Sequence, residues 1–194
     1  MRSVHWTVYS CGLLLFFTMA RLGSVLPTSQ DTKTKYLTRD CINFSTEGML
    51  ITLLHTKTIQ FGLRRLHIPL VKLELILCPV SAYRKCLSFL KSPQRSAFCY
   101  RDTKSGGYSN LNKSLFIKIF REVLQSAGEE DPAGFTGHSF RRGGASWAFQ
   151  SGIPGELIQV CGDWVSDAYK RYLEFSTKNK LEIAQKFARS LCNS

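Results

Sequence analysis

Between Phe135 and Leu173, residues that start or stop helices recur so often that this stretch can only fold as short helices joined by tight turns. The starting signals are hydroxyl side chains and a proline, which suit a helix N-terminus, and the stopping signals are glycines, which accept left-handed backbone geometry easily. In chain order the signals are Thr136 or Ser139, Gly152, Pro154, Gly162 and Ser166. We therefore expect one longer helix, a short second helix, and a third that carries the end of the stretch.

The first and last of these helices carry side chains that suit chemistry on a phosphate. His138 and Arg141 lie at positions i and i+3, so they share one helix face and can converge on a phosphate-sized anion near the positive end of the helix. Trp164 falls in the connection before the third helix, close to Tyr169 and Tyr172, which lie one turn apart. This arrangement favours DNA or another phosphate as the ligand.

The charge of the whole chain favours the same class of ligand. Lysine and arginine number 26 against 14 acidic residues, which gives a formal net charge of +12. Such an excess favours a polyanionic partner through counterion release, although a basic protein without such a partner is the alternative. At 194 residues and 44% hydrophobic composition, the chain can build one sizeable core and is short for two domains.

The ordered set of residues resembles the site-specific tyrosine recombinases, also called phage-integrase-type recombinases. The matching residues are His138 to Arg141, a Gly-Asp-Trp turn ending 26 positions after that histidine, and Tyr172 eight positions further on. The spellings HSFRRGGAS and GDWVSDAYKRYL are most similar to recombinases of eukaryotic mobile elements, the tyrosine-recombinase retrotransposons. A bare His-x-x-Arg is common by chance, so the ordered set carries the resemblance.

The apolar run from Cys11 to Ala20 has two interpretations. Basic residues before the run and small residues at its end are typical of a secretory signal peptide, and sequons at Asn43 and Asn112 would agree with secretion. Alternatively, the run is a buried helix over residues 7–23. The resemblance favours the buried helix, because the family delivers its first catalytic arginine on an apolar helix of this type.

The resemblance identifies that arginine as Arg21. The family usually carries an acidic residue three positions later, where this chain has Ser24. This departure weakens the expected support for Arg21. It leaves a catalytically inactive DNA-binding remnant of a mobile-element recombinase as an alternative to an active enzyme.

Cysteine usage favours the buried helix over secretion. Seven cysteines are scattered without a C-x-x-C pair, which argues against a zinc site, and their odd number argues against a complete disulfide framework. We therefore expect reduced thiols in a nuclear or cytoplasmic protein. The apolar run is also too short to span a bilayer, so no membrane association is expected.

Residues 40–70 have a β-like pattern, with strands expected at 41–44, 49–56 and 66–70. Together with the helices elsewhere, this pattern predicts an α+β fold, a mainly α-helical catalytic domain with a small three-stranded antiparallel sheet. Lys57 lies at the edge of the second hairpin, where a lysine is usually an exposed charge. The resemblance instead implies that it protonates the departing 5′ oxygen. Arg64 and Arg65 are interpreted as contacts to the nucleic-acid backbone.

Helical periodicity predicts three further helices, over residues 78–90, 110–127 and 176–192, and a loop over 92–107. Asn110 is expected to cap the middle helix, and its apolar stripe is Leu111, Leu115, Ile119, Val123 and Leu124. The last helix carries an apolar seam. The seam either docks on its own domain or mediates self-association on DNA, and both interpretations remain open.

The resemblance implies a role for each matching residue. Tyr172 would attack a DNA phosphodiester and form a 3′-phosphotyrosyl link, with Tyr169 as the alternative nucleophile. Two arginines would clamp the non-bridging oxygens, His138 would bind the same phosphate, and Trp164 would donate its indole N–H and buttress the site. The implied catalytic set is Arg21, Lys57, His138, Arg141, Trp164 and Tyr172. Resealing by the 5′ hydroxyl of the other strand requires neither a metal nor a nucleotide cofactor.

The resemblance covers residues 1–194, interpreted as one tyrosine recombinase catalytic domain. Recombinases of this type normally carry a helical DNA-binding domain before the catalytic one, whereas Met1 here lies close to the expected Arg21 helix. The expectation is therefore a catalytic domain without the N-terminal core-binding domain. Its partner would be double-stranded DNA, and its activity would be strand breakage and rejoining in recombination or integration.

Overall fold

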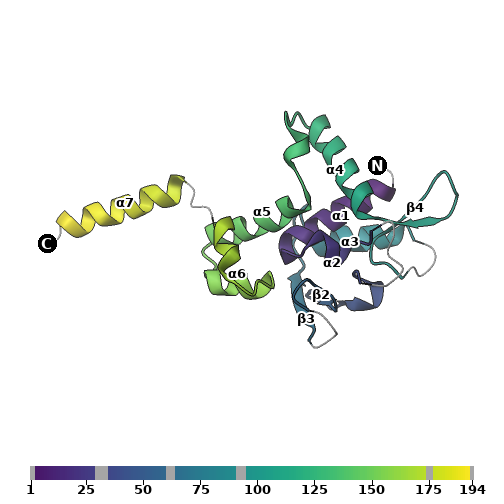
Figure 1. Ribbon diagram of the computed structural model, residues 1–194, viewed down its shortest axis with the longest axis horizontal. Coiled ribbons are helices and arrows are strands. Elements are labelled where there is room, and N and C mark those ends of the chain that lie inside the picture. Colours follow the sequence, from purple (N-terminus) through teal and green to yellow (C-terminus); the bar gives the residue numbers. More distant parts are fainter. Residues whose placement is uncertain (1–2, 29–34, 60–63, 91–94, 174–176, 193–194) are drawn as a thin grey trace.

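One apolar helix, α1 (Ser3–Thr18), runs through the middle of the molecule, and the other elements pack around it (Figure 1). This computed structural model describes residues 3–28, 35–59, 64–90, 95–173 and 177–192. Cys11, Leu14 and Leu15 are fully buried at the centre of the core. Around α1 lie α3 (Pro79–Ser88), α4 (Lys113–Ser126) and α5 (Gly137–Gln150). A cleaved signal peptide could not form the centre of the mature core, so the structure supports the buried-helix interpretation.

The end of α1 differs from the expected one. We expected a helix over 7–23 with Arg21 at its end, but α1 ends at Thr18. The Thr18 hydroxyl donates to the Leu14 carbonyl and accepts from the Ala20 N–H, which satisfies backbone groups that another helical turn would have used. Met19 then takes a left-handed conformation with φ of 51°. Arg21 therefore lies in the sharp turn before the short helix α2 (Leu22–Val25).

The three-stranded antiparallel sheet is confirmed. Its strands are β1 (Ile42–Phe44), β2 (Gly48–Leu53) and β3 (Leu66–Val71), in the order β1-β2-β3. A short 3-10 helix, η1 (Arg39–Cys41), precedes them. In the central strand, Ile51 pairs with Ile42 on one side and Ile68 on the other, and this row of apolar side chains is buried. The second strand ends at Leu53 rather than at residue 56, which leaves Lys57 in the connection between β2 and β3.

The expected loop over 92–107 is wrong in part, because a second small sheet forms there. Strand β4 (Cys99–Arg101) pairs with β5 (Tyr108–Asn110). Asn110 is held in this pairing, so the cap of α4 is Asn112, whose side chain accepts from the Leu115 N–H at 2.9 Å. The apolar stripe of α4 is also shifted, since Phe116 and Ile119 are its buried residues and Val123 is 50% exposed.

The helix signals between residues 135 and 173 are confirmed. After the 3-10 turn η2 (Pro132–Gly134) come α5, α6 (Gly155–Cys161) and η3 (Asp167–Tyr172). The last of these is a 3-10 helix rather than an α-helix. Gly144 lets α5 cross α1 closely, because a Cβ there would lie 2.1 Å from the Phe16 carbonyl oxygen.

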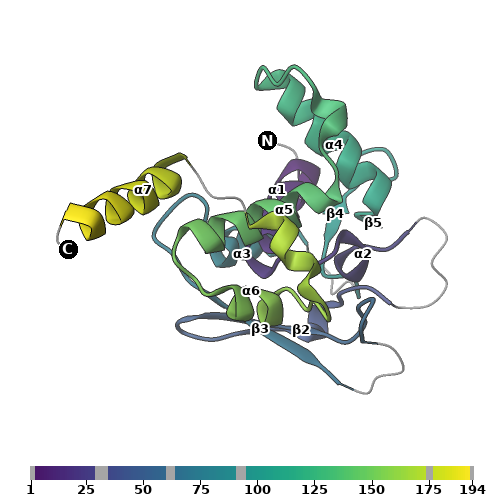
Figure 2. The ribbon, with the colours of Figure 1, turned by 60° about the vertical axis from the view of Figure 1, so that its left-hand side comes forward.

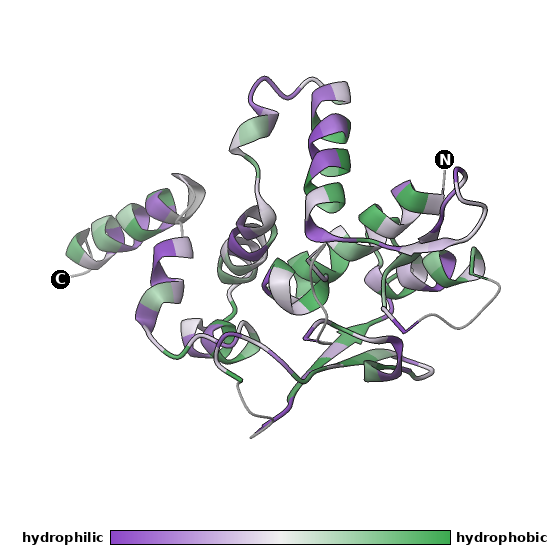
Figure 3. Cartoon of the chain, turned by 45° about the vertical axis from the view of Figure 1, so that its right-hand side comes forward, coloured by the Kyte–Doolittle hydropathy of each residue, from purple (hydrophilic) through white to green (hydrophobic). Residues whose placement is uncertain are grey.

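The last helix, α7 (Thr177–Cys192), lies apart from the rest of the molecule in two views (Figures 1 and 2). Hydrophobic and hydrophilic residues alternate along it (Figure 3). Its exposed apolar side chains are Leu181, Ile183, Phe187 and Leu191. Across the described parts of the chain, no helix is both long and apolar enough to cross a membrane.

Candidate active site

Arg141 is the buried centre of the predicted site. Thr136 caps α5 in a reciprocal capping box with Ser139, which fixes the start of the helix five residues before Arg141. Arg141 is 3% exposed, and its Nη1 donates to the carbonyl of Met19, at the left-handed turn after α1. The guanidinium carbon lies 3.6 Å from the centroid of the Trp164 ring, in cation–π geometry.

A small cavity opens beside this guanidinium. Within the described residues, Nη2 of Arg141 is buried and has no hydrogen-bond partner. The cavity has a volume of about 10 Å³, room for about one water molecule, and opens to solvent between the end of α1, the β2–β3 side of the sheet and the turn after α6. Arg21, Arg141 and Asp163 line it, so two cations and an unused N–H donor face its opening.

The charge of Arg141 is affected by three neighbours. Burial lowers its pKa to about 10, and the nearby positive charge of Arg21 lowers it too, whereas Tyr172 and Asp163 raise it. With a pKa of about 10, the guanidinium stays protonated at neutral pH. An anion placed between the two arginines would relieve their mutual repulsion, which is the electrostatic signature of an anion site.

Both candidate tyrosines contact Trp164, but their environments differ. The ring of Trp164 lies 6.2 Å from that of Tyr169 and 6.0 Å from that of Tyr172. Tyr169 is 3% exposed and packs on Gly155, where a Cβ would lie 3.3 Å from the tyrosine hydroxyl. Tyr172 is only partly buried, and the Ser146 hydroxyl holds its main-chain carbonyl. Tyr172 is thus the less buried of the two tyrosines beside Trp164.

The Gly162-Asp163-Trp164 turn places the indole. A Cβ at Gly162 would lie 1.6 Å from the Trp164 ring, so only glycine allows the ring to fold back over the end of α6. Asp163 takes a left-handed conformation with φ of 56°, which reverses the chain. Trp164 is 9% exposed and buttresses the Arg141 guanidinium from one side.

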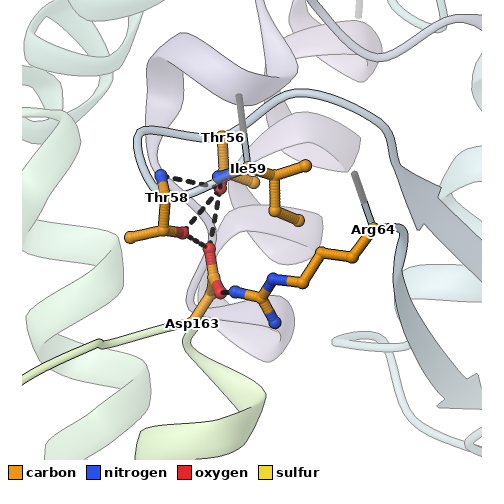
Figure 4. Close-up of polar contacts among 5 residues, drawn as sticks. All are labelled: Thr56, Thr58, Ile59, Arg64 and Asp163. Carbon is orange, nitrogen blue, oxygen red and sulfur yellow. Dashed lines mark hydrogen bonds and ion pairs between the residues drawn. The ribbon is translucent and has the colours of Figure 1, made fainter. Parts of the chain in front are cut away.

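Lys57 is exposed in the connection between β2 and β3, and its two neighbours are fastened to the turn after α6. Figure 4 shows the Thr56 and Thr58 hydroxyls donating to the carboxylate of Asp163, the first at 2.7 Å. Arg64 forms an ion pair with the other carboxylate oxygen. Arg64, interpreted from sequence as a nucleic-acid contact, thus has a partner within the chain, and its side chain is 53% exposed.

His138 lies in the first turn of α5, one turn before Arg141, and its side chain is exposed. Its main-chain N–H donates to Thr136. His138 does not line the cavity, whereas Ser24 does, beside Arg21. Arg21, Arg141, Trp164 and Tyr172 therefore lie close together in the structure, and the connection that carries Lys57 lies next to the Trp164 turn. The imidazole of His138 lies outside this group and is exposed on the first turn of α5.

Two participants were missed from the sequence. The Met19 carbonyl, which holds Arg141, depends on a positive φ that no local signal predicts for methionine. The Asp163 carboxylate had a weak signal, because a buried acid in a basic chain needs donors, and Thr56 and Thr58 flank the singled-out lysine.

No family model and no curated protein matches the sequence. Several solved structures, however, share the fold. The XerH site-specific recombinase, bound to palindromic difH substrate in a post-cleavage complex, matches 97% of this chain with a TM-score of 0.67 and 14% identity. The XerA recombinase matches 95% with a TM-score of 0.62 and 14% identity. An FLP recombinase–Holliday junction complex matches 86% with a TM-score of 0.54 and 17% identity.

The matches cover only part of each recombinase. They extend over 48% of the XerH chain, 62% of XerA and 40% of FLP, so this chain spans about half the length of these proteins. At such low sequence identities the likeness concerns the fold. The helices and the three-stranded sheet described above are therefore the α+β fold that occurs in these site-specific recombinases.

Proposed function

We propose that this chain forms the catalytic domain of a tyrosine recombinase, which breaks and rejoins double-stranded DNA. The observation that carries the proposal is the cavity between Arg21 and Arg141, where a buried Nη2 donor lacks a partner within the described residues and Tyr172 lies beyond the supporting Trp164 ring. Two fixed cations and a nearby hydroxyl are the groups that phosphoryl transfer to a tyrosine needs.

In the proposed reaction, the Tyr172 oxygen attacks the phosphorus of a phosphodiester. An O–P bond to the tyrosine forms while the bond from phosphorus to the 5′ oxygen breaks. The tyrosine proton leaves with the help of His138, and Lys57 gives a proton to the departing 5′ oxygen. Arg21 and Arg141 bind the non-bridging oxygens as negative charge builds up. A 5′ hydroxyl of another strand reverses the step, so the number of phosphoester bonds is unchanged and no energy source is needed.

DNA is the substrate class that the charge and the structural neighbours favour. The formal net charge of +12 suits a polyanion, and the XerH and FLP structures of the same fold are complexes with difH substrate and with a Holliday junction. The spellings HSFRRGGAS and GDWVSDAYKRYL further suggest an origin in a eukaryotic retrotransposon. We place the activity in the nucleus or cytoplasm, where such an enzyme meets DNA.

A covalent trap tests the proposal without knowledge of the target site. The protein is incubated with nicked duplexes of random sequence, from which the short cleaved fragment diffuses away, so that rejoining cannot occur. The protein is then denatured, and the DNA that stays covalently attached to it is sequenced. The wild type should retain covalent DNA, and Tyr172→Phe should retain none. Tyr169→Phe is the matched control and should still form the adduct. An adduct that survives in Tyr172→Phe would overturn the choice of nucleophile, and no adduct with the wild type would overturn the activity.

A DNA-binding protein without catalysis is the second candidate, and Ser24 favours it. Ser24 lines the cavity beside Arg21 and offers no negative charge to support that arginine. Salt-dependent DNA binding by a wild-type protein that forms no covalent adduct would favour this candidate. Arg21→Ala should then weaken binding about as much as loss of any single phosphate contact.

We also propose that α7 mediates self-association. Its apolar residues are exposed, and a large apolar groove lies between α1, α4, α5 and the segment before α3, with Leu75, Val123 and Trp147 exposed along it. An amphipathic helix seated in an apolar groove is a common recognition mode, so the α7 of a second copy suits this surface.

Sedimentation of the chain with and without the residues after Thr177 tests this assembly. Phe187→Asp and Val123→Asp should each reduce the oligomer as the deletion does, because they place a charge on the helix face and in the groove. Arg189→Asp introduces the same side chain elsewhere on α7 and is the control. An oligomer of unchanged size after the deletion would contradict the assembly.

A further inference from the structure

The Asp163 carboxylate collects three donors from the connection between β2 and β3. Thr56 and Thr58 both donate to Oδ2, and Arg64 binds Oδ1 (Figure 4). The Asp163 side chain is 5% exposed, whereas that of Arg64 is 53% exposed. These three donors offset the cost of burying the carboxylate, because an unpaired carboxylate would be costly to bury.

The position of these donors relative to Lys57 is informative. Thr56 and Thr58 stand on either side of the lysine, so both neighbours of Lys57 are tied to one carboxylate. The Thr56 hydroxyl also accepts from the Ile59 N–H at 2.9 Å, and Ile59 is buried. The backbone that carries Lys57 is thereby fixed from both directions, and only the lysine side chain is left exposed.

The other end of the contact is the turn that carries Trp164. Asp163 immediately precedes the indole that covers Arg141, and it lines the same cavity as Arg21 and Arg141. Burial raises the pKa of Asp163, but the hydrogen bonds from Thr58 and Thr56 and the charge of Arg64 lower it by more, so that the pKa lies below its ordinary value. The carboxylate is therefore ionised at neutral pH and can hold all of its donors.

We propose that Asp163 is a positioning residue that holds the backbone of Lys57 beside the anion cavity, which Thr56 lines, and couples it to the Trp164 turn. This role rests on the proposed function, in which Lys57 protonates the leaving oxygen. General acids act only within hydrogen-bond reach, and a displacement of about 1 Å can slow a reaction roughly 100-fold. Asp163 acts through Lys57 and does not itself touch the reacting atoms.

Asp163→Asn separates the charge of this residue from its backbone role. Asparagine tolerates the left-handed conformation, so the turn that carries Trp164 should persist. Its amide cannot balance the Arg64 charge, and its single oxygen cannot accept all the donors that the two carboxylate oxygens accept. Thr52→Val is the control, because it removes a hydroxyl of the same sheet that bonds His67 and not Asp163.

The first measurement does not depend on activity. Hydrogen exchange of the Thr58 and Ile59 amides should be about 10-fold faster in Asp163→Asn than in the wild type, because the Thr56 hydroxyl that accepts from both amides loses its anchor. Thr52→Val should leave these amides unchanged. Equal exchange in the wild type and Asp163→Asn would overturn the positioning role.

The second measurement tests the link to Lys57 by the rate of adduct formation on the duplex recovered in the covalent trap. With a normal 5′ oxygen, Asp163→Asn should be slowed about 10- to 100-fold, in the same direction as Lys57→Ala. With sulfur in place of the bridging 5′ oxygen, both variants should approach the wild-type rate, because a thiolate leaves without a proton. A slowed Asp163→Asn that sulfur does not rescue would overturn this inference alone. A wild type without any adduct would contradict the proposed function itself.

Discussion

The core around α1 and the small cluster around Trp164 are held together in different ways. The α1 core extends over α1, α3, α4 and the three-stranded sheet and is built almost wholly from buried apolar side chains. The Trp164 cluster is much smaller and depends on close aromatic and cationic contacts; it consists of Met19, Ala145, Ile158, Trp164 and Tyr169. The candidate catalytic residues lie at the Trp164 cluster, which contains fewer buried apolar side chains than the α1 core.

The fold tolerates the buried cation of Arg141 because each region supplies one contact to it. Arg141 lies where the two regions meet, with its Nη1 on the Met19 carbonyl after α1 and its face on Trp164. The large core fixes the first contact, and the Gly162 turn fixes the second. We infer that the α1 core supplies the stability of the domain and that the Trp164 cluster supplies the geometry of the site.

The largest expected effect is on the α1 core itself. Leu15 is fully buried, so Leu15→Ala should lower the free energy of unfolding by about 2–5 kcal/mol. Ile158→Ala in the Trp164 cluster should lie at or below the bottom of this range, because partly buried neighbours can collapse into the space. Urea denaturation measures both variants. An equal or larger loss in Ile158→Ala would break the proposed division between the regions.

A pair of adjacent glycines in α5 tests the contact between the regions. Gly144→Ala should destabilise the fold by about 1–3 kcal/mol, because its Cβ would lie 2.1 Å from the Phe16 carbonyl oxygen. Gly143→Ala should instead stabilise it by up to about 1 kcal/mol, because a Cβ there makes only ordinary contact with the Phe16 ring at 3.5 Å. Thermal unfolding should therefore move in opposite directions. A shift of the same sign in both variants would contradict the close helix crossing.

A smaller effect is expected from pH. The pKa of Asp163 is lower in the folded protein than its ordinary value of 3.8, so its contribution to stability is present above that value and is lost as pH falls through the folded pKa. The wild type should therefore exceed Asp163→Asn in stability at neutral pH, and the difference should shrink on acidification. Denaturation of both proteins from pH 7 to pH 3, in about one-unit steps, measures it. A difference that grows in acid would contradict the paired carboxylate.

The smallest effect concerns thiol reactivity and leaves both regions folded. Cys11, Cys86 and Cys99 are buried, and burial raises the pKa of each thiol. Cys161 is exposed and lines the anion cavity. Alkylation followed by peptide mapping should modify Cys161 at least about 10-fold faster than the three core thiols, because exposed thiolates react and buried thiols are inert. Equal rates would indicate that the α1 core opens as readily as the site.

Local rules predicted the parts of the fold in which the decisive residues are neighbours. Thr136 begins α5 and Gly152 follows its end in a left-handed conformation, as expected, because caps and left-handed glycines act within one turn. Gly162 also ends its helix as expected, but with φ of −85°, so it is needed for the close approach of the Trp164 ring and not for left-handed geometry. The short strands β4 and β5 were missed, since three-residue strands leave little periodicity to detect. The early end of α1 was missed because one threonine side chain, that of Thr18, stops the helix.

The candidate site could be predicted only residue by residue. The spacing of the motif predicted that Arg141, Trp164 and Tyr172 lie near one another, because they follow one another on connected short elements. The contact between Thr56 and Asp163 spans 107 positions, and no local pattern reports a hydrogen bond formed by the packing of a sheet edge on a helix turn. The ion pair between Arg64 and Asp163 was missed for the same reason, since the two residues are 99 positions apart.

The most direct test of the account is the identity of the residue that carries DNA after cleavage. The covalent complex is trapped on a nicked duplex, digested with nuclease and protease, and its peptides are analysed by mass spectrometry. The account predicts one nucleotide remnant, attached to the oxygen of Tyr172 in a peptide that begins after Lys170 or Arg171. A remnant on Tyr169, or on any residue other than Tyr172, would contradict the claim that Tyr172 reacts beside Arg21 and Arg141.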